Sequence, residues 1–206
     1  MTKVVVFSGG IGSGKDYCSE YLQDYLGGGN SSIVHFKRPL YDIVAAIYGL
    51  NVSQVFARHN TRDFKEVPWT LYGGKSSREV FIEVSEDVIK PHYGDKFFGE
   101  RALARIISLP QFPIFIFGDS GFEEELEPVS NYVGKENVIL CRIRNRGSFS
   151  NDSRSFLSDK HAGTVLDYDN SGSLEDLHKW VESVGDMILK ESELDATGCL
   201  LNKCSS

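Results

Sequence analysis

Five short apolar runs alternate along the chain with segments in which apolar residues recur at helical spacing. The first run, Val4–Phe7, is apolar without alternation, as in a strand that is covered on both faces of a parallel sheet. Such runs predict strands at residues 3–8, 32–36, 113–117, 137–143 and 163–168. Helical spacing predicts helices at residues 15–26, 39–47, 76–89, 95–108, 123–132 and 174–189.

This alternation of strands and helices predicts an α/β fold, in which a parallel sheet carries helices on both faces. The chain of 206 residues fits one domain, at residues 1–193, followed by a loose tail at residues 194–206. Within the domain we expect a core at residues 1–50 and 110–193, a helical insertion at about 51–109 and a lid at about 144–161. Ligands of such sheets bind at the carboxyl ends of the strands.

A glycine-rich loop joins the first predicted strand to the first predicted helix. It matches the pattern G-x-x-x-x-G-K and consists of Gly9, Gly10, Ile11, Gly12, Ser13, Gly14, Lys15 and Asp16. Its glycines allow consecutive N–H groups to surround an anion, and the positive end of the helix strengthens that field. Lys15 supplies a cation for the β- and γ-phosphates. We therefore predict a triphosphate-binding loop in which Lys15 is catalytic.

Two carboxylates are candidates for binding Mg²⁺ at the same edge of the sheet. Asp16 stands where this loop usually carries a Ser or Thr that ligates the ion. It fits either a metal ligand, directly or through water, or a cap of the helix N-terminus, and the two roles are compatible. Asp119 follows another buried strand, where it fits a metal ligand, a contact with the acceptor or a cap of the next helix.

Arginines gather around one polar loop of an otherwise acidic chain. Arg144, Arg146 and Arg154 all lie in the predicted lid. Phosphoryl transfer spreads negative charge over the moving group, and arginines that close over it stabilise that charge and exclude water. We predict that these three arginines are catalytic, although any single one of them fits a solvent-exposed charge as well.

The helical insertion carries basic and aromatic side chains in the region where nucleoside monophosphate kinases hold the acceptor. Its basic residues include Arg62, Lys65, Arg78 and Arg101. Arg78 follows two serines at a predicted helix start, and it is the best candidate for binding the acceptor phosphate. Trp69 fits stacking on a base. The predicted substrate-binding residues are Arg62, Trp69, Arg78 and Asp119.

Composition limits the partners of the protein. A net charge of −7 argues against a general affinity for nucleic-acid backbones, although a nucleotide pocket needs only a few cations. Four scattered cysteines are expected to be reduced thiols. Neither a signal peptide nor an apolar run of membrane-spanning length is visible, so we expect a cytoplasmic protein that binds no membrane. The sequence is compatible with assembly into a homodimer.

Several segments resemble elements of bacteriophage deoxynucleoside monophosphate kinases, in the right order. Residues 8–16 resemble the loop S-G-x-x-x-S-G-K-D of that family, in which Asp after Lys is usual. Residues 116–125 resemble its D-x-R-F-x-x-E element, except that Gly121 stands where many relatives carry Arg. Further similar segments lie at residues 77–87, 94–98 and 169–177.

This resemblance implies a P-loop kinase fold with a helical substrate-binding insertion and a short lid. It also implies transfer of the ATP γ-phosphate to a deoxynucleoside monophosphate (dNMP), with Mg²⁺, giving ADP and a dNDP. Two alternatives remain. One is a phage P-loop kinase that acts on a hydroxymethylated base in DNA, and the other is a nucleotide-binding switch or inhibitor with little turnover. The sequence does not indicate which base or sugar is accepted, or whether a donor other than ATP is used.

Overall fold

The computed structural model describes residues 1–150 and 154–203, and the side chains of these residues except 62 and 192–203. Within these residues, five parallel strands form one sheet in the order β2-β3-β1-β4-β5. The strands are β1 (Lys3–Ser8), β2 (Ser31–Ile33), β3 (Ile114–Phe117), β4 (Val138–Arg144) and β5 (Thr164–Asp169). The structure confirms the predicted α/β fold, a parallel sheet with helices on both faces.

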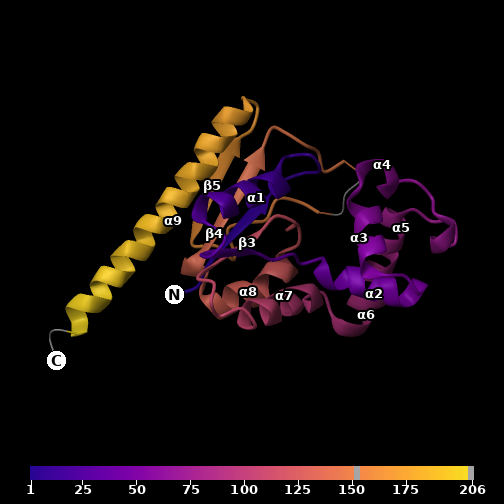
Figure 1. Ribbon diagram of the computed structural model, residues 1–206, viewed down its shortest axis with the longest axis horizontal. Helices are drawn as coiled ribbons and strands as arrows, with labels where there is room; N and C mark the ends of the chain where they lie inside the picture. Colours follow the sequence, from indigo (N-terminus) through magenta and orange to yellow (C-terminus); the bar gives the residue numbers. More distant parts are fainter. Residues whose placement is uncertain (151–153, 204–206) are drawn as a thin grey trace.

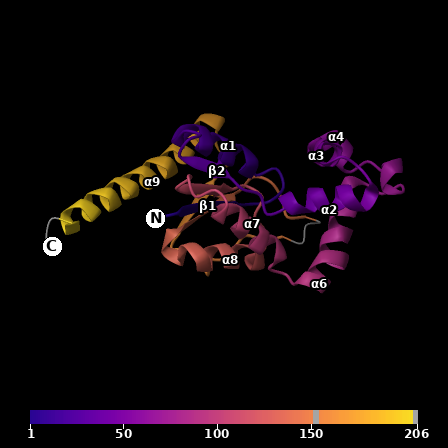
Figure 2. The ribbon, with the colours of Figure 1, turned by 60° about the horizontal axis from the view of Figure 1, so that its bottom comes forward.

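Four helices cover the two faces of the sheet (Figure 2). One face carries α1 (Lys15–Leu26) and α9 (Leu174–Lys203), and the other carries α7 (Phe97–Ile107) and α8 (Glu123–Val133). Successive side chains of β1 point to opposite faces, so Val5 packs beneath α1 and α9 whereas Val4 packs toward α7 and α8. Both residues are fully buried, as their unbroken apolar run predicted.

The chain between β2 and β3 forms a helical region at one side of the sheet (Figure 1). It contains α2 (Arg38–Tyr48), α3 (Val52–Asn60), α4 (Arg62–Lys65), the 3₁₀-helix η1 (Thr70–Tyr72), α5 (Ser77–Ile82), the π-helix η2 (Glu83–Ile89) and α6 (Lys90–Tyr93). The expected insertion at 51–109 also included α7, but α7 packs with α8 beneath the sheet. The helical region therefore ends before α7.

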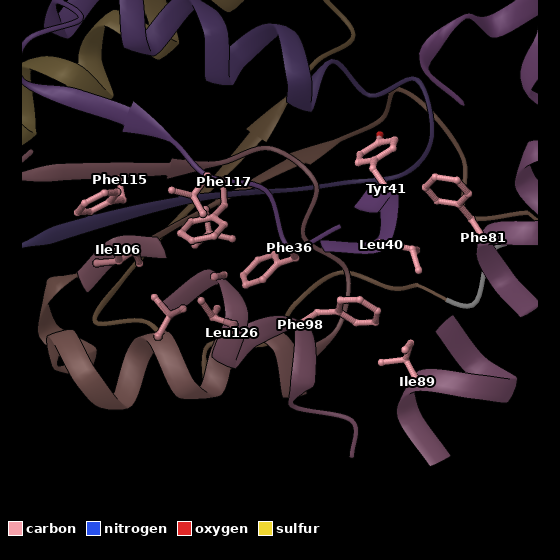
Figure 3. Close-up of a cluster of buried hydrophobic side chains, with 14 of the residues drawn as sticks. Phe36, Leu40, Tyr41, Phe81, Ile89, Phe98, Ile106, Phe115, Phe117 and Leu126 are labelled. Atoms are coloured by element: carbon pink, nitrogen blue, oxygen red, sulfur yellow. The ribbon is translucent and has the colours of Figure 1, made fainter. Parts of the chain in front are cut away.

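One hydrophobic cluster joins this helical region to the sheet (Figure 3). The ring of Phe36 stacks on that of Phe117 at the end of β3, with centroids 4.5 Å apart. Farther from the sheet, Tyr41 and Phe81 meet edge to face at 5.1 Å, and Phe98 lies between the two groups of rings. Because the sheet and the helical region share this core, charged side chains at their junction are held in place.

The helix that carries Arg78 begins with a capping box. The Ser76 hydroxyl accepts a hydrogen bond from the Glu79 amide at 3.2 Å, and the Glu79 carboxylate accepts one from the Ser76 amide at 2.8 Å. These two bonds start α5 at the place that the serines predicted. The predicted helix at 76–89 then continues through η2 and α6, and Pro91 lies in the first turn of α6.

Two element boundaries differ from the predicted ones by more than two residues. The strand predicted at 32–36 ends at Ile33, because the chain turns there and presents the amides of Phe36 and Lys37 to Asp119. The loose tail predicted from residue 194 is wrong as far as Lys203, since α9 continues to that residue. Leu, Glu and Ala favour helix after Glu191, and no proline interrupts them. Figure 1 shows this part of α9 extending beyond the sheet.

Candidate active site

The glycine-rich loop bends sharply between β1 and α1. Gly12 and Gly14 have φ angles of 80° and 98°, a left-handed conformation that glycine adopts without strain. Gly10 approaches its neighbours so closely that a β-carbon there would lie 2.6 Å from the carbonyl carbon of Ser148. The first turn of an α-helix leaves its N–H groups directed beyond the helix end, so α1 points a positive field into this loop.

The side chain of Lys15 folds back over the glycine-rich loop. Its ammonium group donates hydrogen bonds to the carbonyl oxygens of Gly9 and Gly10, at 2.5 and 2.9 Å, and only 8% of the residue is exposed. Asp16 is exposed in the first turn of α1, whereas the N-cap position belongs to Gly14. The capping role considered for Asp16 is therefore wrong, because the helix begins one residue before it.

The segment after β4 is attached to the same loop. Ile11 and Ser148 exchange two backbone hydrogen bonds, at 2.8 and 3.0 Å. Farther along, the Leu157 amide donates to the Ser8 hydroxyl at 3.1 Å, and the Leu157 carbonyl accepts from the Arg142 guanidinium at 2.8 Å. Residues 151–153 lie outside the described residues. On both sides of residues 151–153, the described parts of the predicted lid therefore lie against the glycine-rich loop or the end of β1.

Asp119 connects the end of β3 to the chain that follows β2. Its two carboxylate oxygens accept hydrogen bonds from the amides of Phe36 and Lys37, at 3.2 and 3.1 Å, and the residue is 9% exposed. It does not cap the next helix, because α8 begins four residues later with Phe122 as its N-cap. Burial lowers the pKa of Lys37, but Asp119, Tyr41 and Asp16 together outweigh this, so the pKa is raised.

A cavity of about 180 Å³ lies between Asp119 and the helical region. Four basic side chains line it, and we call them the cation cluster: Lys37, Lys65, Arg78 and Arg154. The other lining residues include the rings of Phe36, Phe81, Phe98 and Phe122 and the carboxyl groups of Glu86, Asp119 and Glu125. Basic residues from separate segments of the chain therefore converge on one space with aromatic walls.

The cations of this cluster repel one another. Burial, and after it the positive charges of Lys37, Arg78 and Arg154, lower the pKa of Lys65 to about 8. His59, which stacks on Phe81 with ring centroids 3.8 Å apart, also has a lowered pKa, first because it is buried. An anion placed among these groups would relieve the repulsion, so the cavity is suited to a negatively charged ligand.

The structure brings three of the predicted site residues to this cavity, and it places two of the predicted lid arginines elsewhere. Arg78, Asp119 and Arg154 line it together. Arg144 donates to the Asp167 carboxylate at 2.6 Å and lies over the Phe156 ring, and Arg146 is exposed. Neither of the two lines the cavity.

Two further candidates, Trp69 and Arg62, come from the middle of the helical region. Trp69 lies in a separate hollow, edge to face with Tyr72 and beneath the Arg58 guanidinium. Arg62 begins α4, and its side chain lies outside the described residues. Stacking by Trp69 and binding by Arg62 remain predictions.

Among the cavity-lining residues that sequence reasoning missed are the charged side chains Lys37 and Glu125. Lys37 follows β2, and its place after a predicted strand was a usable signal because ligands bind at the carboxyl edge of such sheets. Glu125 sits in a run of three glutamates, a pattern typical of a solvated helix face, yet it is 7% exposed. Nothing in the run itself marks its third member as buried.

Gly121 provides the space in which Arg154 lies. A β-carbon at position 121 would be 2.5 Å from Cγ of Arg154 and 2.8 Å from its Cβ, well inside van der Waals contact. The glycine that stands where resembling kinases carry Arg is thus covered by an arginine from another segment. A side chain at position 121 would displace Arg154 from the cavity wall.

Comparisons with known proteins were made for the whole chain. No protein-family model matches it, and no match was found among curated proteins. The chain is similar to the solved structure of APE1195, with a TM-score of 0.47 and 13% identity, covering 91% of this chain and 96% of that one. It is also similar to a shikimate kinase from Bacteroides thetaiotaomicron, with a TM-score of 0.39 and 11% identity, covering 90% of this chain and 98% of that one. Likenesses this weak carry no argument about function.

Among the described residues, no single helix has the length and apolar composition needed to cross a membrane. The helices Arg38–Tyr48 and Val52–Asn60 pass such a test only as a pair, and they are bent by 118° at their junction.

Proposed function

We propose that this protein is a deoxynucleoside monophosphate kinase, which transfers the γ-phosphoryl group of ATP to a dNMP and releases ADP and a dNDP. The observation that carries the proposal is the cation cluster, which lines a cavity close to a phosphate-binding loop. Phosphoryl transfer between two nucleotides needs a polyphosphate site and an adjacent site for an anionic acceptor. The loop and the cavity fit these two needs.

The donor side of the proposal rests on the loop and Lys15. The ammonium group already lies over the loop, so it needs only a small movement to exchange the carbonyl oxygens of Gly9 and Gly10 for phosphate oxygens. The positive end of α1 adds to the attraction for an anion. Such a site holds the β- and γ-phosphates of ATP and directs the terminal phosphorus toward the cavity.

Two carboxylates fit the Mg²⁺ that accompanies ATP. Within the described residues, no group of three or more His, Cys, Asp or Glu side chains forms a metal site. Mg²⁺ does not require one, because it usually binds through one or two carboxylates together with phosphate oxygens and water. Asp16 is exposed beside the loop, and Asp119 keeps lone pairs beyond those used by the two amides. When bound, the ion neutralises charge on the phosphates.

The acceptor side rests on the cavity. Arg78 and Lys65 hold the acceptor phosphate, and we expect Arg154, which lines the same cavity, to contact this phosphate and the moving phosphoryl group. An acceptor phosphate oxygen forms a bond to the γ-phosphorus, while the bond from that phosphorus to the β–γ bridging oxygen breaks and ADP leaves. No general base is needed, because the attacking phosphate is already an anion. The aromatic walls accommodate a base.

An assay of ADP release over all four dNMPs and modified pyrimidine monophosphates tests this proposal, with the product identified as a dNDP by chromatography. We expect ATP-dependent turnover with at least one dNMP. Absence of turnover with every dNMP, in folded protein with Mg²⁺, contradicts the proposal. Phosphorylation of duplex DNA containing hydroxymethyluracil, with none of free dNMPs, contradicts it in favour of a kinase that acts on DNA.

Replacing Gly121 by alanine is expected to lower kcat/KM for the acceptor by about tenfold, which corresponds to the loss of one charge-assisted contact. The reason is that the new methyl group occupies the space of the Arg154 side chain. Gly28→Ala is a matched control, because a β-carbon at position 28 has no neighbour within 4 Å. Steady-state kinetics at saturating ATP measure the effect. If Gly121→Ala and Gly28→Ala have the same kcat/KM for the acceptor, the position of the Arg154 side chain does not affect use of the acceptor.

A further inference from the structure

Glu125 is a buried carboxyl group on the wall of the acceptor cavity. It lies in the first turn of α8, is 7% exposed and lines the cavity together with Glu86 of η2. Its backbone is held by α7, since Gly99 comes so close that a β-carbon there would overlap the Glu125 carbonyl oxygen. The donor and acceptor phosphates do not need this group, because acidic side chains repel phosphate.

Several charged groups act on Glu125 from the elements packed around it. Burial, and after it the carboxylates of Asp119 and Glu86, raise its pKa from 4.5 to about 8. Lys90 of α6 and Arg154 act in the opposite direction without overcoming burial. At neutral pH the side chain is therefore a neutral carboxylic acid, which donates one hydrogen bond through its O–H and accepts another through its C=O.

Different charged groups act on Lys65 and on Glu125, which line the same cavity. Lys65 is affected by the charges of Lys37, Arg78 and Arg154, whereas Glu125 is affected by Asp119, Lys90, Arg154 and Glu86. Arg154 is common to both groups. The rings of Phe36, Phe81, Phe98 and Phe122 also line the cavity. A ligand that carries a phosphate, a flat apolar ring and a polar ring edge matches all these features at once.

We propose that Glu125 contacts the polar edge of the acceptor's base, and that loss of its proton narrows the complementary bases to guanine. This inference rests on the proposed function, and it adds a residue whose protonation state decides which bases are complemented. As a carboxylic acid, Glu125 complements the edges of thymine, cytosine, adenine and guanine, each of which presents a donor next to an acceptor. As a carboxylate it is an acceptor only, and it then complements only guanine, whose N1–H and N2–H₂ groups are adjacent donors.

Acceptor kinetics as a function of pH test the assignment. We expect the KM for thymine, cytosine or adenine dNMPs that the enzyme accepts to rise about tenfold between about pH 7 and pH 9, as the carboxyl group loses its proton. The KM for dGMP should rise much less. Glu125→Gln keeps one donor and one acceptor at every pH, so its KM profiles should lose this dependence on the base. Glu124→Gln, at an exposed neighbouring position on α8, should behave as wild type.

Two other groups can change the acceptor KM with pH, the acceptor phosphate and Lys65. Their effects have to be separated from that of Glu125. The second ionisation of a phosphate ester lies near pH 6, below the measured range. Lys65 has a pKa of about 8 and loses its charge within it, but this weakens phosphate binding equally for every base and persists in Glu125→Gln. A pH dependence that is the same for every base, or that Glu125→Gln leaves unchanged in an active enzyme, overturns the assignment. Absence of turnover in wild type instead overturns the proposed function.

Thermal unfolding gives a readout that needs no turnover. Between pH 4.5 and about 8 the folded protein keeps a proton on Glu125 that the unfolded chain has lost, so the group's contribution to stability falls as pH rises through this window. Glutamine has no such proton. The Tm of Glu125→Gln relative to wild type should therefore increase from about pH 5 to about pH 8.5. A relative Tm that does not change with pH means that the carboxyl group is ionised in the fold, and it overturns the proposed contact.

Discussion

Replacing Lys15 by alanine is expected to lower kcat for phosphoryl transfer by about a hundredfold or more and to leave the fold intact. The ammonium group is the cation closest to the loop, where it lies on the carbonyl oxygens of Gly9 and Gly10. Without it, negative charge on the moving phosphoryl group loses its main partner on the donor side. An ADP-release assay at saturating acceptor measures the loss.

The control for this change is Lys179→Ala, which removes an exposed lysine that pairs with Glu175 on α9. We expect this variant to keep wild-type turnover, because surface pairs of this kind contribute little. Circular dichroism and thermal melting check that Lys15→Ala is folded. Turnover of Lys15→Ala within about twofold of wild type would mean that the donor binds elsewhere.

Replacing Arg78 by alanine is expected to raise the acceptor KM by about tenfold to a hundredfold and to change the ATP KM little. Arg78 lines the cavity at the start of α5, and its weak 3.5 Å pair with Glu66 is exposed. Loss of that pair should hardly affect stability. Steady-state kinetics with varied acceptor measure the effect.

Two further variants sharpen this prediction. Arg78→Lys should restore only part of the affinity, because an ammonium group cannot bind a phosphate with the paired N–H groups of a guanidinium. Arg105→Ala, at an exposed position on α7, should leave acceptor kinetics unchanged. If Arg78→Ala binds the acceptor as wild type does, the phosphate is held by another part of the cation cluster or outside the cavity.

Local patterns were sufficient to predict the part of the fold that forms the glycine-rich loop at residues 9–16. The apolar run of β1, the glycines after it and the helical spacing from Lys15 all describe neighbouring residues, and each strand-to-helix unit follows short-range rules. The five-stranded parallel sheet then follows from the alternation of elements. The continuation of α9 to Lys203 was missed because composition alone gives weak evidence where a helix leaves the core.

The acceptor cavity could be predicted only in part, because its walls come from segments far apart in sequence. The capping residues before Arg78 and the strand before Asp119 gave local signals for those two positions. The Arg154 side chain lies against Gly121, and Glu125 is buried against α7. Both arrangements depend on packing between elements that are far apart in sequence. No pattern in one segment records such a contact.

The most direct test of the central claim is calorimetric titration of the folded protein with ATP in the presence of Mg²⁺. Measurement at two temperatures guards against an enthalpy of binding that happens to be near zero at one of them. We predict saturable binding of one ATP per chain to wild type and much weaker binding to Lys15→Ala. Absence of any heat of binding at both temperatures, with ATP and with GTP, would contradict the assignment of the loop at residues 9–16 as a nucleotide site.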